Sequence, residues 1–323
     1  MMRATLNIIL LVSLISSGTL LAGETSKLVF AAQWMPQAQF AGYYVAQDRG
    51  FYEEAGISVE FRYPTYTKNS LDYLLSGEAD VASLFLVNAL KAYASGAKPV
   101  NIAQFVQQSS ILFVSRTESN IARLEDFEGK RAGVFMTGFE EIPKSLLADH
   151  GIQVEWMPVL RSVNLFLMGG VDVMTVMYHN EYYHLYLSGI NKDELHTFFM
   201  SDYGYGVPED GLYVMEATLH QKRDLLKAFV EATLRGWHYA AENKDYTVEL
   251  VVNLMRRANI PSNRTHQRWM LDRTIEAYHL DLEPFVATHL QKEDFDKALN
   301  MLLNYGTLQH RIGHQDFHRN ILR

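Results

Sequence analysis

A tryptophan and two glutamines lie close together near the start of the chain, where an apolar run gives way to a helical pattern. Trp34 offers a flat aromatic face, and Gln37 and Gln39 offer amide donors and acceptors. This combination suits a heteroaromatic ring with polar edges, because the face stacks on the ring while amides bond its edge. Phe40 and Tyr43 follow as further candidate contacts, although aromatic side chains are more often buried for packing, an alternative that also applies to Trp34.

A second polar cluster follows the apolar run at residues 171–177. It contains Tyr178, Asn180 and Glu181. A carboxylate there can accept a hydrogen bond from the exocyclic amine of a pyrimidine-like ring, and Tyr178 can cover the ring on the face opposite Trp34. The sequence predicts ligand contacts at all three residues. The alternative role for Glu181 is that of a carboxylate at a helix N-terminus, favoured by the helix dipole.

Two weaker signals add to the predicted site. Thr137 and Gly138 lie in a loop before a helical pattern, where backbone N–H groups can hold a polar group. A single glycine is a weak signal, so it does not predict an anionic ligand. Ser110 precedes a strand-like run and is a candidate hydroxyl in the cleft, with a turn or strand edge as its alternative.

Metal and cofactor chemistry have little support. The chain has 0 Cys, which excludes thiolate ligands and thiol nucleophiles. His179 and His184 are five residues apart and do not share a helical face, and the histidines near the C-terminus lack a carboxylate pattern. We find no Ser-His-Asp order, P-loop or nucleotide fingerprint. We therefore predict neither metal nor cofactor.

Strand-like and helix-like patterns alternate along the chain and must position these residues. Strands are expected at 28–33, 57–63, 80–85, 111–116, 131–135, 154–156, 171–177 and 210–215, with helices between them and a helical pattern from Gln221 onward. This order is typical of α/β proteins with open, mostly parallel sheets, which bind ligands at the carboxyl ends of their strands. We predict one lobe from residues 23–116 and 211–323 and an inserted lobe from residues 117–210.

Several segments carry a family resemblance. They are residues 33–46 (QWMPQAQFAGYYVA), 50–57 (GFYEEAGI), 76–81 (SGEADV), 124–133 (LEDFEGKRAG), 178–182 (YHNEY) and 234–237 (LRGW). Together they resemble solute-binding proteins of ABC importers, in the family that binds thiamine pyrimidine precursors and alkanesulfonates. The resemblance implies the type II periplasmic-binding-protein fold.

The resemblance also implies a function. A small heteroaromatic ligand, with a thiamine pyrimidine precursor as the first expectation, would be captured by closure of the lobes and delivered to an inner-membrane ABC permease. Some relatives bind flavins or alkanesulfonates, so these compounds are alternative ligands. A signalling receptor is the alternative to the permease as a partner. Pyrimidine synthases share the fold, but their cysteine-rich motif is impossible in a chain with 0 Cys, so we expect no enzyme.

The first residues favour export. Arg3 precedes an apolar run at 8–15, and small residues lead to Ala22, which predicts a signal peptide over residues 1–22 and a periplasmic protein. A transmembrane anchor or a buried helix is the alternative, but the apolar run is short for a span and is interrupted by serines and a glycine. The net charge of −8 gives no basic field for nucleic acid, so we expect none as a partner, and we expect a monomer.

Overall fold

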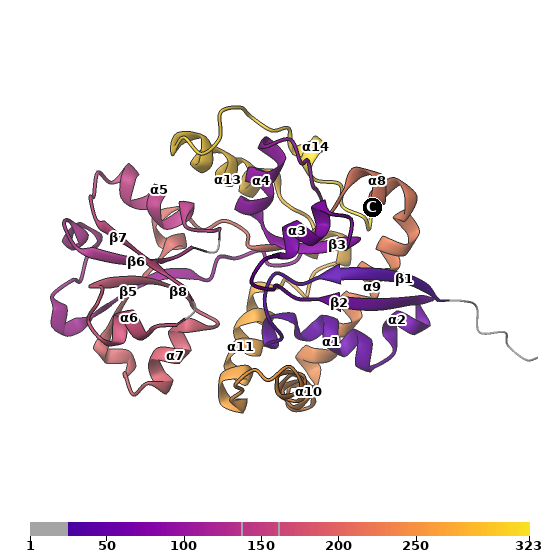
Figure 1. Cartoon of the computed structure of the whole chain (residues 1–323), viewed down its shortest axis with the longest axis horizontal. Coiled ribbons are helices and arrows are strands. Elements are labelled where there is room, and N and C mark those ends of the chain that lie inside the picture. The colour runs from indigo at the N-terminus through magenta and orange to yellow at the C-terminus, as the bar shows by residue number, and fades with distance from the viewer. Residues whose placement is uncertain (1–24, 137, 161) are drawn as a thin grey trace, which may run out of the picture.

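Two five-stranded mixed sheets, each flanked by helices, make up the protein (Figure 1). The computed structural model describes residues 25–136, 138–160 and 162–323. The sheets belong to two lobes that lie side by side, and the C-terminal part of the chain is helical. The predicted α/β architecture with two lobes and a helical C-terminal segment is confirmed.

The first sheet has the strand order β2-β1-β3-β10-β4. Its strands are β1 (Ser26–Ala31), β2 (Ile57–Arg62), β3 (Val81–Phe85), β4 (Val100–Gln104) and β10 (Asp210–Val214). The first three are parallel to one another, whereas β10 runs antiparallel to both β3 and β4. β10 and the edge strand β4 are buried along their whole length, and a β-bridge from Asn101 of β4 to His318 covers part of this edge.

The second sheet has the order β7-β6-β8-β5-β9. Its strands are β5 (Ile111–Arg116), β6 (Arg131–Phe135), β7 (Glu155–Val159), β8 (Val173–Met177) and β9 (Leu195–Phe199). The strand β5 pairs with β8 and β9, so it belongs to this sheet, and the predicted lobe boundary after residue 116 is wrong at this strand. The chain therefore first crosses between the sheets at residues 105–110, and it returns between β9 and β10.

Helices cover both sheets. The first lobe carries α1 (Ala41–Asp48), α2 (Phe51–Glu54), α3 (Ser70–Leu75), α4 (Leu86–Ala94), α8 (Glu216–Gln221) and α9 (Arg223–Glu242). The second carries α5 (Glu141–Asp149), α6 (Asn164–Leu167) and α7 (Glu181–Leu187). Short 3-10 helices are η1 (Ala38–Phe40), η2 (Thr117–Ser119), η3 (Leu124–Phe127), η4 (Lys192–Glu194) and η5 (Met200–Tyr203). In the described part of the chain, no helix is both long and apolar enough for a membrane span.

The C-terminal helices connect the two lobes. They are α10 (Lys244–Arg257), α11 (Arg264–Ala277), α12 (Pro284–Ala287), α13 (Lys292–Asn304) and α14 (His314–Phe317). The helix α13 contacts α4 of one lobe and α5 of the other, and α11 contacts η1 of one lobe and α7 of the other. In Figure 1, α13 and α11 lie on opposite sides of the region where the lobes meet. The C-terminal segment therefore spans both lobes.

The helices α1 and α9 cross at two glycines. A Cβ atom added to Gly236 would lie 2.0 Å from the carbonyl oxygen of Gly42, and one added to Gly42 would lie 2.3 Å from the Trp237 ring. Carbon and oxygen atoms cannot approach so closely, so this crossing requires glycine at both positions. The crossing fixes α1, and with it the loop that precedes α1, against the first sheet.

Candidate ligand-binding site

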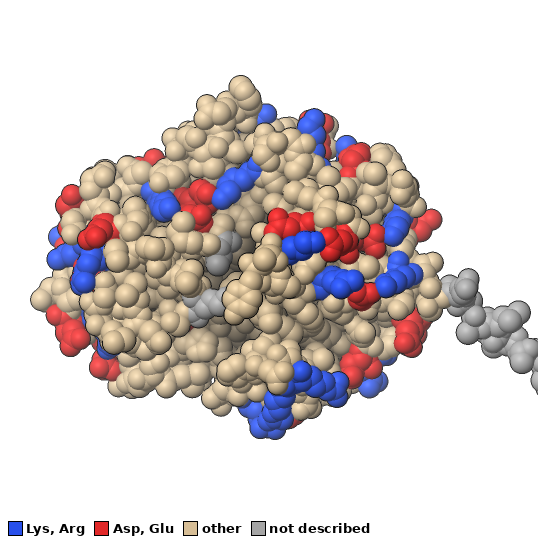
Figure 2. Space-filling view, in the orientation of Figure 1, with Lys and Arg blue, Asp and Glu red and all other residues tan. Residues whose placement is uncertain are grey.

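A cleft of about 700 Å³ separates the two lobes. The first lobe lines it with parts of 33–39, 64–71 and 84–95, and the second with parts of 135–140, Leu160 and 177–181. Figure 2 shows a hollow between the two halves of the molecule, with charges of both signs scattered over the surrounding face. The lining segments follow β1, β2 and β3 on one side and β6, β7 and β8 on the other, so the cleft lies at the carboxyl ends of these parallel strands.

Six of the predicted contact residues line this cleft. They are Trp34, Gln37, Gln39, Gly138, Asn180 and Glu181. Both predicted clusters, the aromatic–amide loop and the polar residues after 171–177, therefore face one space from opposite lobes. Thr137 lies outside the residues that the structure describes.

The loop that carries Trp34 is held from two sides. The backbone N–H of Gln33 donates to Ser83 Oγ at 2.9 Å, which ties the end of β1 to β3. The backbone N–H of Ala38 donates to Oε1 of Gln267, on α11, at 2.8 Å. The indole ring of Trp34 is half-buried and packs against the core of the first lobe. These bonds place the tryptophan at the cleft without help from a ligand.

Phe40 and Tyr43 do not line the cleft. Both rings are buried in the core of the first lobe. The Tyr43 ring stacks on Phe30 of β1 with a centroid distance of 4.7 Å. The ring therefore lies between α1 and the first sheet. Core packing, the alternative role for aromatic residues in this segment, accounts for its burial.

Tyr178 and Ser110 also lie away from the cleft lining. The Tyr178 ring packs edge-on against Trp269 of α11 at 5.3 Å, and its carbonyl oxygen accepts a hydrogen bond from Trp269 Nε1 at 2.9 Å. This contact joins the second lobe to α11. The Ser110 hydroxyl donates to Glu209 Oε2 at 3.0 Å and lies 3.0 Å from His179 Nδ1, so it is part of a buried network at the first crossing.

Glu181 begins α7 and already has local partners. Its Oε2 accepts the backbone N–H of Met177 at 3.0 Å, and its Oε1 accepts the side-chain N–H of Asn180 at 2.7 Å. Burial raises the pKa of Glu181, and these hydrogen bonds lower it and so offset part of the increase. The carboxylate therefore ties the end of β8 and the side chain of Asn180 to the first residue of α7, and it lines the cleft as well. A ligand contact at this residue remains a prediction.

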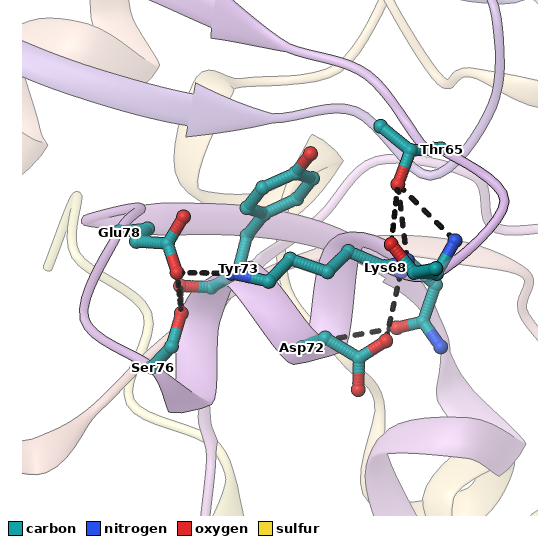
Figure 3. A network of polar contacts seen from close by, with 8 residues as sticks. Thr65, Lys68, Asp72, Tyr73, Ser76 and Glu78 are labelled. Carbon is teal, nitrogen blue, oxygen red and sulfur yellow. Dashed lines mark hydrogen bonds and ion pairs between the residues drawn. The ribbon is translucent and has the colours of Figure 1, made fainter.

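The loop after β2 forms one rim of the cleft and is internally braced (Figure 3). The side chain of Asn69 accepts the backbone N–H of Asp72 at 3.1 Å, and Asp72 accepts the backbone N–H of Asn69 at 2.8 Å, which makes a capping box at the start of α3. Lys68 forms an ion pair with Glu78. These contacts hold Asn69 and Ser70 at the cleft.

Direct contacts cross the cleft near α4. Lys91 of α4 forms an ion pair with Glu141 of α5 at 2.5 Å. The ring of Phe85, at the end of β3, meets that of Phe139 edge-on at 5.2 Å. A Cβ atom on Gly138 would lie 2.4 Å from the amide of Asn88, so glycine permits this close approach of the lobes.

Sequence reasoning missed three buried groups beside the cleft. Burial raises the pKa of Asp210 to about 6, and burial together with the nearby Asp210 raises the pKa of Glu209 to about 8. Burial lowers the pKa of His179, which lines the cleft, to about 4. Two adjacent carboxylates directly before an apolar strand were the signal that could have indicated this site.

We expect Glu209→Gln to become progressively more stable than the wild type as pH rises from 7 to 9. The folded-state pKa of Glu209 is about 8, whereas the ordinary pKa of a glutamate is 4.5. The folded protein therefore holds a proton that the unfolded chain has lost, and the free energy of unfolding falls as pH rises through this window. Loss of this one proton between pH 7 and 9 changes the difference in unfolding free energy between variant and wild type by about 1–2 kcal/mol. The buried histidines are present in both proteins, so their effects on the unfolding free energy cancel in the difference. Urea unfolding at the two pH values, with the exposed Glu53→Gln as control, measures the difference; a constant difference would contradict the prediction.

Comparison with known proteins identifies the family. Residues 37–246 match the family described as NMT1/THI5 like. The chain belongs to the NMT1/THI5-like family. The predicted family resemblance is therefore confirmed, and the matched region includes both the aromatic–amide loop from Gln37 onward and the residues around Glu181.

Two relatives of this NMT1/THI5-like chain are named for different ligands. It is 25% identical to a formylaminopyrimidine-binding protein of Halalkalibacterium halodurans, over 71% of this chain and 70% of that protein. It is 24% identical to the riboflavin-binding protein RibY of Chloroflexus aurantiacus, over 79% of this chain and 74% of that protein.

Solved structures share the fold. The periplasmic aliphatic sulphonate binding protein SsuA from Escherichia coli superimposes with a TM-score of 0.68, covering 90% of this chain and 91% of that one at 11% sequence identity. The NMT1/THI5-like chain therefore has the periplasmic-binding-protein fold that its strand order indicated.

Proposed function

We propose that this protein is the periplasmic binding subunit of an ABC importer and captures a small heteroaromatic nutrient, a pyrimidine precursor of thiamine being the leading candidate. The observation that carries the proposal is the cleft, which places Trp34 of one lobe opposite Asn180 and Glu181 of the other. A volume of about 700 Å³ lies within the range of small-molecule sites. The relatives named for formylaminopyrimidine and riboflavin binding support a heteroaromatic ligand.

Ligand capture would proceed by lobe closure. The lobes are joined by two crossings, residues 105–110 and the segment between β9 and β10, and a ligand that bridges the walls favours the state in which they are close. The contacts across the cleft, such as Lys91 with Glu141, stabilise that state. The closed form would then dock on the permease. No chemistry on the ligand is part of this function, and export through residues 1–22 lies outside the described residues and stays a prediction.

Thermal unfolding in the presence of candidate ligands tests this function. The panel is a formylaminopyrimidine, 4-amino-5-hydroxymethyl-2-methylpyrimidine, riboflavin and an alkanesulfonate. A ligand at about 1,000 times its Kd stabilises the folded state by about 4 kcal/mol, which raises the melting temperature measurably. We expect a pyrimidine to do so, and small-angle scattering with that compound to give a smaller radius of gyration.

The same measurements can contradict the proposal. A panel in which no compound changes the melting temperature would count against small-molecule capture by this cleft. Binding without any change in the radius of gyration would count against closure of the lobes and leave capture standing.

A further inference from the structure

A chain of three glutamine amides connects a buried carboxylate to the cleft. Asp210, at the start of β10, is buried, and its Oδ2 accepts the side-chain N–H of Gln39 at 2.6 Å. Its Oδ1 accepts the side-chain N–H of Gln33. Oε1 of Gln39 in turn accepts the side-chain N–H of Gln37 at 2.7 Å. All three glutamines line the cleft.

The carboxylate decides which way each amide faces. An ionised carboxylate can only accept hydrogen bonds, so Gln33 and Gln39 must both turn their nitrogen atoms toward Asp210. With its nitrogen engaged, Gln39 presents its oxygen to Gln37, and Gln37 must also turn its nitrogen inward. Reversal of any amide would bring two acceptor oxygens into contact. The carbonyl oxygens of Gln33 and Gln37 are therefore the ends of the chain.

These two end oxygens need donors. In the part of the chain that the structure describes, no hydrogen-bond donor contacts Oε1 of Gln37, and Oε1 of Gln33 is buried without a partner. A buried acceptor without a hydrogen bond, such as Oε1 of Gln33, is unfavourable, and a ligand N–H group can supply the missing bond. The buried side chains of Gln37 and Gln39, each less than a tenth exposed, have little freedom to rearrange.

The rest of the described lining also favours a donor over an anion. The second lobe presents the carboxylate of Glu181, and the first presents two amide oxygens. Among the described lining residues, Lys91 is the only lysine or arginine, and its ammonium group is engaged by Glu141 across the cleft. An anionic ligand would meet the carboxylates of Glu140 and Glu181 on the second wall and the acceptor oxygens of the glutamines on the first.

We propose that Asp210 is a positioning residue that fixes the oxygens of Gln33 and Gln37 as acceptors and so selects a ligand bearing N–H donors, such as an aminopyrimidine, against alkanesulfonates and other anions. This inference rests on the proposed function, because it assumes that the cleft binds a small solute. It assigns the choice of ligand class to a residue that lies behind the cleft wall.

A pair of nearly isosteric rings tests the selection at pH 7.5. The ring 4-amino-2-methylpyrimidine carries the donor group, and 2,4-dimethylpyrimidine replaces it with a methyl group; methanesulfonate supplies the anion. By calorimetry, we expect the wild type to bind the amino ring at least tenfold more tightly than the methyl ring, and to bind methanesulfonate more weakly than either. In Asp210→Asn the new amide can donate as well as accept, so the glutamines can reverse, and the preference should fall below threefold.

Two further variants separate selection from folding. Gln33→Met removes one acceptor and should lower the preference in the same direction. Asp80→Asn alters a half-buried carboxylate of the same lobe that accepts Lys222 at 2.6 Å and does not line the cleft, and it should keep the full preference. Thermal melts establish that each variant is folded.

The outcomes are distinguishable from a failure of the proposed function. If Asp210→Asn is folded and keeps the tenfold preference, or if the wild type favours methanesulfonate, the role of Asp210 is overturned while solute binding stands. If the wild type binds neither ring, nor any compound of the wider panel, both the inference and the proposed function are overturned.

Discussion

Gly236→Ala is expected to leave the protein largely unfolded or destabilised by more than about 3 kcal/mol. The added methyl group would lie 2.0 Å from the carbonyl oxygen of Gly42 and 2.9 Å from Cβ of Ala46. The obstacle is backbone, so no side-chain movement relieves it, and α9 would have to move away from α1. Because α1 follows the loop that carries Trp34, the same movement would disturb the cleft.

Urea unfolding followed by circular dichroism measures this effect. The matched control is His238→Ala, two residues along the same helix and exposed, which should change the stability by less than about 0.5 kcal/mol. A Gly236→Ala protein as stable as the wild type would mean that α1 and α9 do not cross as closely as described.

Trp34→Ala and Glu181→Gln are each expected to weaken binding of the identified heteroaromatic ligand at least tenfold. Loss of a stacked aromatic face costs about 1–3 kcal/mol, and loss of a charge-assisted hydrogen bond costs a similar amount. Tenfold corresponds to about 1.4 kcal/mol.

Glu194→Gln is the control for Glu181. Glu194 accepts the backbone N–H of Asn191 at 2.7 Å and its side-chain N–H at 2.9 Å, so like Glu181 it accepts one backbone and one asparagine N–H, but it does not line the cleft. Tyr305→Ala removes an aromatic ring outside the cleft and serves as the control for Trp34. Calorimetric titration of the identified ligand into Trp34→Ala, Glu181→Gln and the two control variants measures these effects. Unaltered affinity in both Trp34→Ala and Glu181→Gln would place the ligand elsewhere.

The sequence predicted the features that depend on local pattern. Alternating strand and helix patterns indicated two α/β lobes, and the rule that ligands bind at the carboxyl ends of parallel strands brought Trp34 and Glu181 to one cleft. The strand at 111–116 was assigned to the wrong lobe, because its apolar residues suit either sheet and only its pairing with β8 and β9 distinguishes them.

Long-range packing limited the prediction of the site. Tyr178 faces away from the cleft because Trp269, 91 residues later, packs against it. Tyr43 has the residue type of a ligand contact, but the phase of α1 directs it into the core. Asp210 contacts glutamines more than 170 residues earlier in the chain. No spacing in the sequence indicates such partners, which only the assembled fold brings together.

A crystal structure of the mature protein saturated with the pyrimidine that most raises its melting temperature tests the central claim most directly. The account predicts one molecule between the lobes, with its ring against Trp34, its N–H donors toward Gln33 or Gln37, and Glu181 within hydrogen-bonding distance from the other wall. An empty cleft in a crystal that holds the ligand at another site, or a ligand bound by one lobe alone with the lobes apart, would contradict it.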